Sequence, residues 1–144
     1  MAVSGQFNIV RAFVAGVDLT GHKFKAVMLS SGNIIVPLAA AGDGADMIGI
    51  LQDEPESGQV GEVVIFGFSK VVAKEAIAVG NFIMATGSDT AADSGKVLVA
   101  TEQGTDEAAE MMIGRALQAA AADGNIIEAW ITGSVPADRR IAAA

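Results

Sequence analysis

The chain has 144 residues and a formal net charge of −8 at pH 7, from nine Lys and Arg against 17 Asp and Glu. This length fits one compact domain, and the hydrophobic fraction of 51% includes 27 Ala, so we expect a core built largely from small side chains. The absence of Cys excludes disulfides, thiol nucleophiles and zinc–thiolate sites, and the shortage of positive charge argues against nucleic acid as a partner.

Residues 1–20 mix polar and apolar side chains irregularly and are predicted to form an extended N-terminal arm that leads into a strand. Residues 21–134 consist of short β-favouring runs separated by turn residues, which is typical of an all-β domain. Residues 135–144 are interpreted as a C-terminal tail, either frayed or a small docking peptide. The strands predicted first are Lys23–Ser30, Asn33–Leu38, Met47–Leu51, Glu62–Phe68, Lys70–Ala73, Asn81–Ala85, Lys96–Thr101 and Asn125–Thr132.

The residues between and within these strands indicate the fold class. Ser31-Gly32 predicts a tight hairpin turn, because Gly accepts a positive φ without steric cost. The run Glu62–Phe68 is apolar on both faces, so it is expected to be a central strand that is covered on both sides. Together, the short and evenly spaced strands favour a mainly β fold, a small β-barrel or sandwich with an N-terminal arm.

An internal repeat is the most informative pattern in the chain. The tripeptide Met47-Ile48-Gly49 recurs as Met112-Ile113-Gly114. After a shift of one residue, five residues of the first copy match five of the second: Gln52, Gly58, Glu62, Ile65 and Gly67 match Gln118, Gly124, Glu128, Ile131 and Gly133. The repeat therefore predicts that each copy is a strand, a short polar connection and a second strand.

The repeat conflicts with local helix propensity over residues 105–123. This segment is rich in Ala, Glu, Met and Leu, and by itself it predicts a helix. The first copy of the repeat cannot be one helix, because Pro55 and Gly58 interrupt it. We therefore predict a strand at Met112–Leu117, with a short helix at Thr105–Glu110 as the alternative for the residues before it.

The sequence predicts no catalytic, cofactor-binding or metal-binding residues. The single histidine, His22, has no nucleophile recognisably placed beside it, and it is interpreted as a surface or interface residue. The acidic groups at Asp53–Glu56 and Glu102–Glu110 lack the spacing of a calcium loop and are interpreted as solvated turns. The single tryptophan, Trp130, is expected to pack in the core or at a subunit interface, with a ligand-stacking platform as the alternative.

A membrane partner is not expected either. The most apolar long stretch, residues 34–51, is interrupted by Pro37 and two Asp, so it is too short for a transmembrane helix. Arg11 and Asp18 interrupt the only candidate for a secretory signal, and synthesis in a cytoplasm is the expectation.

Over residues 26–133 the chain resembles the capsid cement, or head decoration, proteins of tailed bacteriophages. The resemblance is carried by Met47-Ile48-Gly49 with Glu62-Val63-Val64-Ile65, by residues 70–81, and by the return of the pattern at residues 113–117 and 124–128. It implies a small β-rich protein without enzymatic activity or cofactor. Such a protein binds the outer surface of the expanded capsid, typically as trimers at three-fold and quasi-three-fold positions. The implied partners are the phage major capsid protein and further copies of the chain, and the implied location is the outside of the virion after synthesis in the bacterial host cytoplasm.

The resemblance also implies an N-terminal arm that contacts the major capsid protein. Here the arm would add an extended strand to the edge of a capsid sheet. The candidate residues, assigned by position, are Gln6, Phe7, Asn8, Ile9, Val10, Arg11, Phe13 and Val14. If this assignment holds, deletion of residues 2–14 is expected to leave a folded domain that no longer binds capsids.

Two other classes of function stay open on the sequence alone. A β-barrel recognition module for a protein or carbohydrate partner is the alternative, although such a module needs exposed aromatic side chains and the chain has no Tyr and one Trp. An enzyme assembled around His22 or the acidic turns ranks third.

Overall fold

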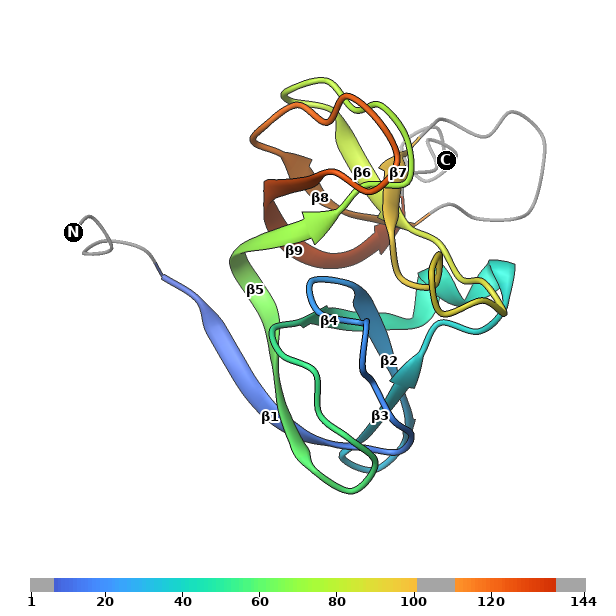
Figure 1. Cartoon of the computed structure of the whole chain (residues 1–144). Coiled ribbons are helices and arrows are strands. Elements are labelled where there is room, and N and C mark those ends of the chain that lie inside the picture. Colours follow the sequence, from blue (N-terminus) through green and yellow to red (C-terminus); the bar gives the residue numbers. More distant parts are fainter. Residues whose placement is uncertain (1–6, 101–110, 137–144) are drawn as a thin grey trace.

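The computed structural model describes residues 7–100 and 111–136. These residues form nine β-strands and one short 3₁₀ helix, η1 (Ala41–Asp46) (Figure 1). The strands are β1 (Ile9–Ala15), β2 (Ala26–Ser31), β3 (Ile34–Pro37), β4 (Met47–Leu51), β5 (Val60–Val72), β6 (Phe82–Ala85), β7 (Val97–Val99), β8 (Met111–Ala116) and β9 (Ile126–Pro136). The mainly β fold class predicted from the sequence is confirmed.

Strands β1 to β4 and the first half of β5 close into a five-stranded barrel. Antiparallel pairing runs from β3 to β2, β4, β5 and back to β1. A short parallel contact between β1 and β3 completes the ring. The interior of this first barrel is filled by Phe13, Ala15, Leu19, Val27, Ile35, Leu51 and Val63.

The second half of β5 and strands β6 to β9 repeat this arrangement. Antiparallel pairing runs from β5 to β9, β8, β6 and β7. An isolated parallel bridge between Ala73 and Val97 then connects β7 back to the end of β5, as the parallel contact does in the first barrel. In Figure 1 the two groups of strands lie one above the other, and β5 runs through both. Strand β5 is therefore the last strand of the first barrel and the first strand of the second.

The two barrels correspond in register, residue by residue. Val27 lies opposite Gly49 in the first barrel, and Ile83 lies opposite Gly114 in the second, and in both barrels the register shifts immediately afterwards. Across the following strands the corresponding outer positions are Ala26, Ile50 and Val64 in the first barrel, and Phe82, Arg115 and Trp130 in the second. The repeat read from the sequence is confirmed, and it extends beyond one pair of strands to both barrels.

Two glycines of the repeat, Gly49 and Gly114, lie where a side chain would collide with the neighbouring strand. A Cβ atom on Gly49 would collide with the carbonyl oxygen of Val64, and a Cβ on Gly114 would collide with that of Trp130. Val64 and Trp130 occupy corresponding positions in β5 and β9. Glycine at these sites therefore permits the same close approach of two backbones in each barrel.

Several predicted elements can be compared directly with the observed strands. The hairpin over Ser31-Gly32 is confirmed, with Gly32 at a φ of 46°. The strand predicted at Met112–Leu117 is confirmed as β8, so the helix propensity of this part of the chain is overridden by strand pairing. The alternative helix at residues 105–110 lies outside the described residues. The strands predicted as Glu62–Phe68 and Lys70–Ala73 are one continuous strand, β5.

The outer side of the first barrel is covered by the second barrel. Ala26, Met47 and Ile50 point away from the first core, yet they are buried in the same cluster as the core of the second barrel. The connection between β6 and β7 is fastened to this region: Ser94 Oγ donates to the carbonyl of Leu38 at 2.9 Å. The Lys25 ammonium donates to the carbonyls of residues 91 and 92 at 3.0 and 3.1 Å. The two barrels thus share one buried interface.

Candidate functional site

The residues predicted to form a capsid-binding arm lie in β1 and just before it. Gln6 lies outside the described residues. Phe7, Ile9 and Val10 are exposed, with exposed fractions of 68%, 46% and 44%. Phe13, in contrast, is 4% exposed and belongs to the core of the first barrel. The segment is therefore divided between a surface part and a part that folds with the barrel.

Asn8 and Arg11 fasten the segment to the barrel. The side chain of Asn8 donates to the carbonyl of Phe68 at 3.0 Å and accepts from the N–H of Phe68 at 2.9 Å. Arg11 donates to the Asn33 side chain at 3.0 Å, and its guanidinium carbon lies 5.2 Å from the centre of the Phe13 ring. Deletion of residues 2–14 removes a strand of the closed barrel, so this packing does not fit the expectation that the truncated domain stays folded.

Strand β1 keeps one open edge over its first half. The N–H of Val14 donates to Asn33 on the β3 side at 2.9 Å, whereas the N–H of Ala15 donates to Gln59 on the β5 side at 2.8 Å. Because backbone groups alternate in direction along a strand, the N–H of Ala12 points away from β5. Strand β3 pairs with β1 only at Val14 and Ala15. Within the described part of the chain, the edge beside Ala12 is therefore available to an added strand.

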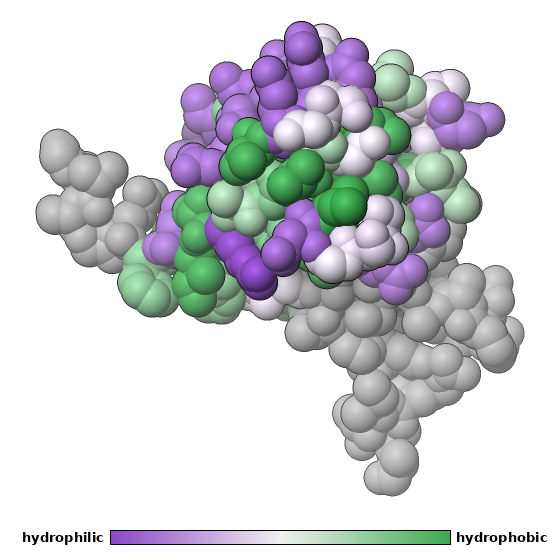
Figure 2. All heavy atoms as spheres, turned by 90° about the horizontal axis from the view of Figure 1, so that it is seen from below, coloured by the Kyte–Doolittle hydropathy of each residue, from purple (hydrophilic) through white to green (hydrophobic). Residues whose placement is uncertain are grey.

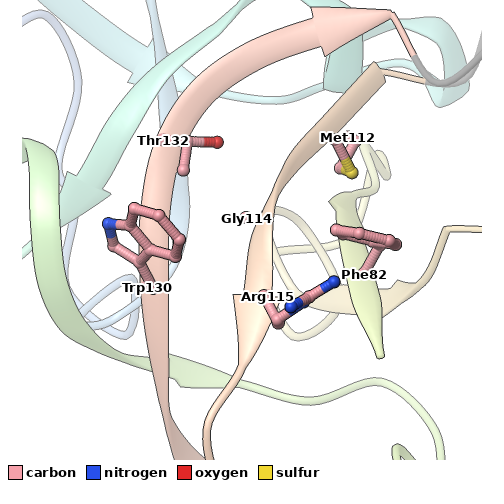
Figure 3. A pocket seen from close by; sticks show the side chains of 6 residues that line it. All are labelled: Phe82, Met112, Gly114, Arg115, Trp130 and Thr132. Atoms are coloured by element: carbon pink, nitrogen blue, oxygen red, sulfur yellow. The ribbon is translucent and has the colours of Figure 1, made fainter. Parts of the chain in front are cut away.

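A second candidate surface lies on the outer side of β6, β8 and β9. It holds a shallow pocket of about 200 Å³ (Figure 3). We call this surface the open face; its residues are Phe82, Met112, Gly114, Arg115, Trp130 and Thr132.

The open face is aromatic and carries one positive charge, the guanidinium of Arg115. The guanidinium carbon of Arg115 lies 4.3 Å from the centre of the Phe82 ring, a cation–π contact (Figure 3). Trp130 meets Phe66 edge to face, with ring centres 6.5 Å apart. Phe82 and Trp130 are 45% and 40% exposed, respectively. Of the places considered for Trp130 from the sequence, the core is excluded, because a large part of the ring faces solvent.

Sequence reasoning missed Phe82 and Arg115 as surface residues of interest. The signal was present in the repeat, because Arg115 stands where the first copy has Ile50, and Trp130 stands where it has Val64. A charged residue in the place of a buried apolar one shows that the two copies have different surroundings.

His22 is 3% exposed, and its Nδ1 atom has no hydrogen-bond partner among the described residues. Of the two places predicted for His22, the surface or an interface, the surface is excluded, because the residue is buried within this chain. Burial lowers the pKa of His22, and the positive charge of Lys25 lowers it further, while Asp18 and Glu54 act in the opposite direction. No nucleophile is placed beside it by a hydrogen bond in the described structure, so this site carries no catalytic proposal.

We expect the stability of the domain to fall as the pH is lowered through the range in which histidine titrates. Because the pKa of folded His22 lies below its ordinary value of 6.5, the unfolded chain binds this proton more readily. The stabilising effect of neutral His22 is present above that ordinary value and is lost as the pH falls through the folded pKa. The measurement is the free energy of unfolding as a function of pH, compared with His22→Gln. An equally steep pH dependence in the variant would contradict the assignment to His22.

The acidic turn at residues 53–56 serves the fold. The Asp53 carboxylate accepts the N–H of Glu62 at 3.3 Å, and the Glu54 carboxylate accepts the N–H of Gly21. Across the described residues, no group of three or more His, Asp or Glu side chains is arranged to hold a metal ion. The second acidic group, Glu102–Glu110, lies outside those residues. In the described part of the chain, no helix is long and apolar enough to span a membrane.

The chain is similar in structure to a protein of known fold, although not to any family model or curated protein. No family model matches the chain, and no curated protein matches it. Among solved structures, the chain matches the N base of the head fiber gp8.5 of bacteriophage phi29, with a TM-score of 0.57. The fold is similar to that of a phage head fiber base. The match covers 89% of this chain and 97% of the other at 20% sequence identity, so the similarity of fold extends over most of both chains.

Proposed function

We propose that the chain is a non-enzymatic structural protein of a tailed-phage virion. It binds the outer surface of the expanded capsid as a cement or decoration protein, in trimers at three-fold and quasi-three-fold positions. Its partners are the major capsid protein and further copies of itself. The observation that carries the proposal is the similarity of fold to the phi29 head fiber base, which supports the resemblance found in the sequence.

The physical properties of the chain support this role. A protein that binds only the assembled lattice stabilises that lattice by mass action and needs no active site. Trimeric attachment lets several modest contacts act together, which raises the avidity without a large interface on each chain. The net charge of −8 fits a location away from packaged DNA.

The experiment that tests the proposal is co-sedimentation of the purified protein with expanded capsids that lack it. We expect saturable binding and increased resistance of the loaded capsids to heat or chelation. Unexpanded capsids serve as the control for lattice specificity. Absence of binding to correctly expanded capsids would refute the cement role.

We further propose that β1 contacts the capsid through its open edge, by addition of a strand. Ala12 offers a sharp test, because it is exposed and its N–H points away from β5. Ala12→Pro removes that N–H, and proline is tolerated on an edge strand where the N–H is not used by the fold.

For Ala12→Pro we expect loss of capsid co-sedimentation with a folded domain, because one main-chain hydrogen bond and the fit of the added strand are lost. The matched control is Ala12→Val, which keeps the N–H and is expected to bind. Circular dichroism and thermal unfolding establish that both variants are folded. Equal binding by the two folded variants would show that the edge is not the contact.

A further inference from the structure

The internal duplication reveals a surface that is covered in one barrel and left uncovered in the other. In the first barrel, Ala26 and Ile50 are fully buried and Val64 is 3% exposed. Their counterparts in the second barrel are the open-face residues Phe82, Arg115 and Trp130, of which Phe82 and Trp130 are 45% and 40% exposed.

The two faces differ in what packs against them. The outer side of β2 and β4 packs against the core of the second barrel, which follows it in sequence. The outer side of β6 and β8 has no following barrel within the described residues. A repeat unit buries its apolar face against a neighbouring unit, so a face that is buried in one copy and exposed in the other is suited to a further partner.

We propose that the open face is covered by a second copy of this chain, which associates head to tail. This inference deepens the proposed function, because it names the surface through which the copies of the proposed trimer meet. The proposal rests on the observation that the corresponding face of the first barrel, at Ala26, Ile50 and Val64, is buried within the same chain.

The charges of the chain favour a copy of itself as the occupant. The ion pairs among the described residues all involve Lys74 or Lys96, so Arg115 has no carboxylate partner there. The whole chain carries eight more negative than positive charges, so another copy offers carboxylates to Arg115. A two-fold contact of open face with open face would instead place two Arg115 side chains in one small interface, which is unfavourable.

A different surface of the chain has the complementary character. On the outer side of the first barrel, Val60 lies opposite Val14, and Val14 lies opposite Ile34 in the next strand. Val60 and Val14 are 61% and 36% exposed. We call these three residues the aliphatic row. Figure 2, which views the molecule from below Figure 1, shows hydrophobic residues gathered on this end of the molecule and bordered by hydrophilic ones.

The aliphatic row also carries a negative charge beside it. Glu62 is exposed, lies two residues after Val60 on the same strand, and has no ion pair among the described residues. Because side chains alternate along a strand, Glu62 and Val60 share one face. The aliphatic row is therefore complementary to the open face in two ways. Its aliphatic side chains can pack against the aromatic rings, and the carboxylate of Glu62 can pair with Arg115. Two unlike surfaces in contact form a heterologous interface, which closes into a ring when the rotation permits.

The only tryptophan of the chain reports directly on this contact. As the protein concentration rises, we expect the mass measured by sedimentation equilibrium to rise from the single-chain value of 14.6 kDa to a multiple of it. Over the same range, the emission of Trp130 is expected to shift to the blue and its quenching by acrylamide to fall. A chain that stays monomeric at all concentrations overturns the proposal.

Substitutions test which surface is responsible. Phe82→Ser and Arg115→Glu are expected to abolish the association, so that the mass returns to that of one chain. The matched controls are Phe7→Ser and Arg115→Lys. Phe7 is 68% exposed but lies outside the open face, and Arg115→Lys keeps the positive charge. Both controls are expected to associate. Association by folded Arg115→Glu equal to that of the unchanged protein overturns the proposal.

Mixing two variants tests the head-to-tail geometry. Arg115→Glu damages the open face, and Val60→Asp damages the aliphatic row. Each variant alone is expected to be monomeric. An equimolar mixture retains one intact face on each chain and is expected to form dimers and nothing larger. A mixture that stays monomeric overturns the head-to-tail contact.

Two further results point to other occupants, and each overturns the proposal. The first is a monomeric protein whose Trp130 becomes shielded only when capsids are added, which identifies the capsid protein as the partner. The second is shielding by a soluble oligosaccharide, which identifies a recognition module. Because the association is measured without capsids, failure of this proposal is distinguishable from failure of the cement role.

Discussion

Phe13→Ala is expected to lower the free energy of unfolding by about 3–5 kcal/mol, the usual cost of truncating a buried phenylalanine. Phe13 is 4% exposed and packs inside the first barrel with Leu51 and Val63. The substitution removes most of a large side chain from a closed barrel that has little room to collapse. The measurement is chemical denaturation followed by circular dichroism.

The matched control is Phe7→Ala, which makes the same change six residues earlier. Phe7 is 68% exposed, and its loss is expected to change the stability by no more than about 0.5 kcal/mol. The pair of variants determines where the barrel begins. If both substitutions have the same small effect, β1 is a detachable arm after all and the first barrel is stable without it.

Gly114→Ala is expected to destabilise the chain by about 3 kcal/mol, at the upper end of the cost of overpacking. The added Cβ would collide with the carbonyl oxygen of Trp130, and a backbone group of a paired strand cannot rotate away. Because Gly49 occupies the corresponding position against Val64, Gly49→Ala is expected to have an effect of similar size. Thermal and chemical denaturation measure both.

The control is Gly124→Ala, at a turn where a Cβ would meet no atom within 4 Å. Its φ of 92° makes alanine somewhat unfavourable there, at a cost of about 1–2 kcal/mol. A loss of stability at Gly114 that does not exceed the loss at Gly124 would refute the close approach of β8 and β9 at this point.

The duplication links the stability of the fold to its proposed association. In the first barrel, the face formed by Ala26, Ile50 and Val64 is buried and apolar, and Ala26 and Ile50 pack in the same cluster as the core of the second barrel. The open face has the same backbone frame, but it carries Phe82, Arg115 and Trp130, which suit a surface that is exposed before association and buried after it. The same backbone arrangement thus forms an interface within the chain in the first barrel. In our proposal it forms an interface between two chains in the second barrel.

Much of the local structure could be predicted from the sequence. The hairpin at Ser31-Gly32 follows from the positive φ that glycine permits, and strand β4 follows from a run of β-favouring residues between turns. The strand β8 could be predicted only through the repeat, because its Ala-rich and Met-rich surroundings favour a helix by propensity alone. For β8, the similarity to a distant segment of the same chain predicted the strand, whereas the local composition predicted a helix.

The placement of β1 was decided by the tertiary structure. An irregular mixture of polar and apolar residues indicated an arm, yet Phe13 and Ala15 are buried because β1 pairs with β5, almost fifty residues later in the chain. Pairing between distant strands leaves no local periodicity that marks its partner, so a segment that closes a barrel can look like a free terminus.

The features of the candidate surfaces were likewise only partly predictable from the sequence. The sequence by itself determined the β-rich class, the repeat and the apolar character of Ile9 and Val10. Only the tertiary structure decided that Ile50 is buried whereas its counterpart Arg115 lies on the surface. The physical reason is that burial depends on what packs against a position: the second barrel packs against Ile50, whereas the open face around Arg115 is left exposed in the described part of the chain.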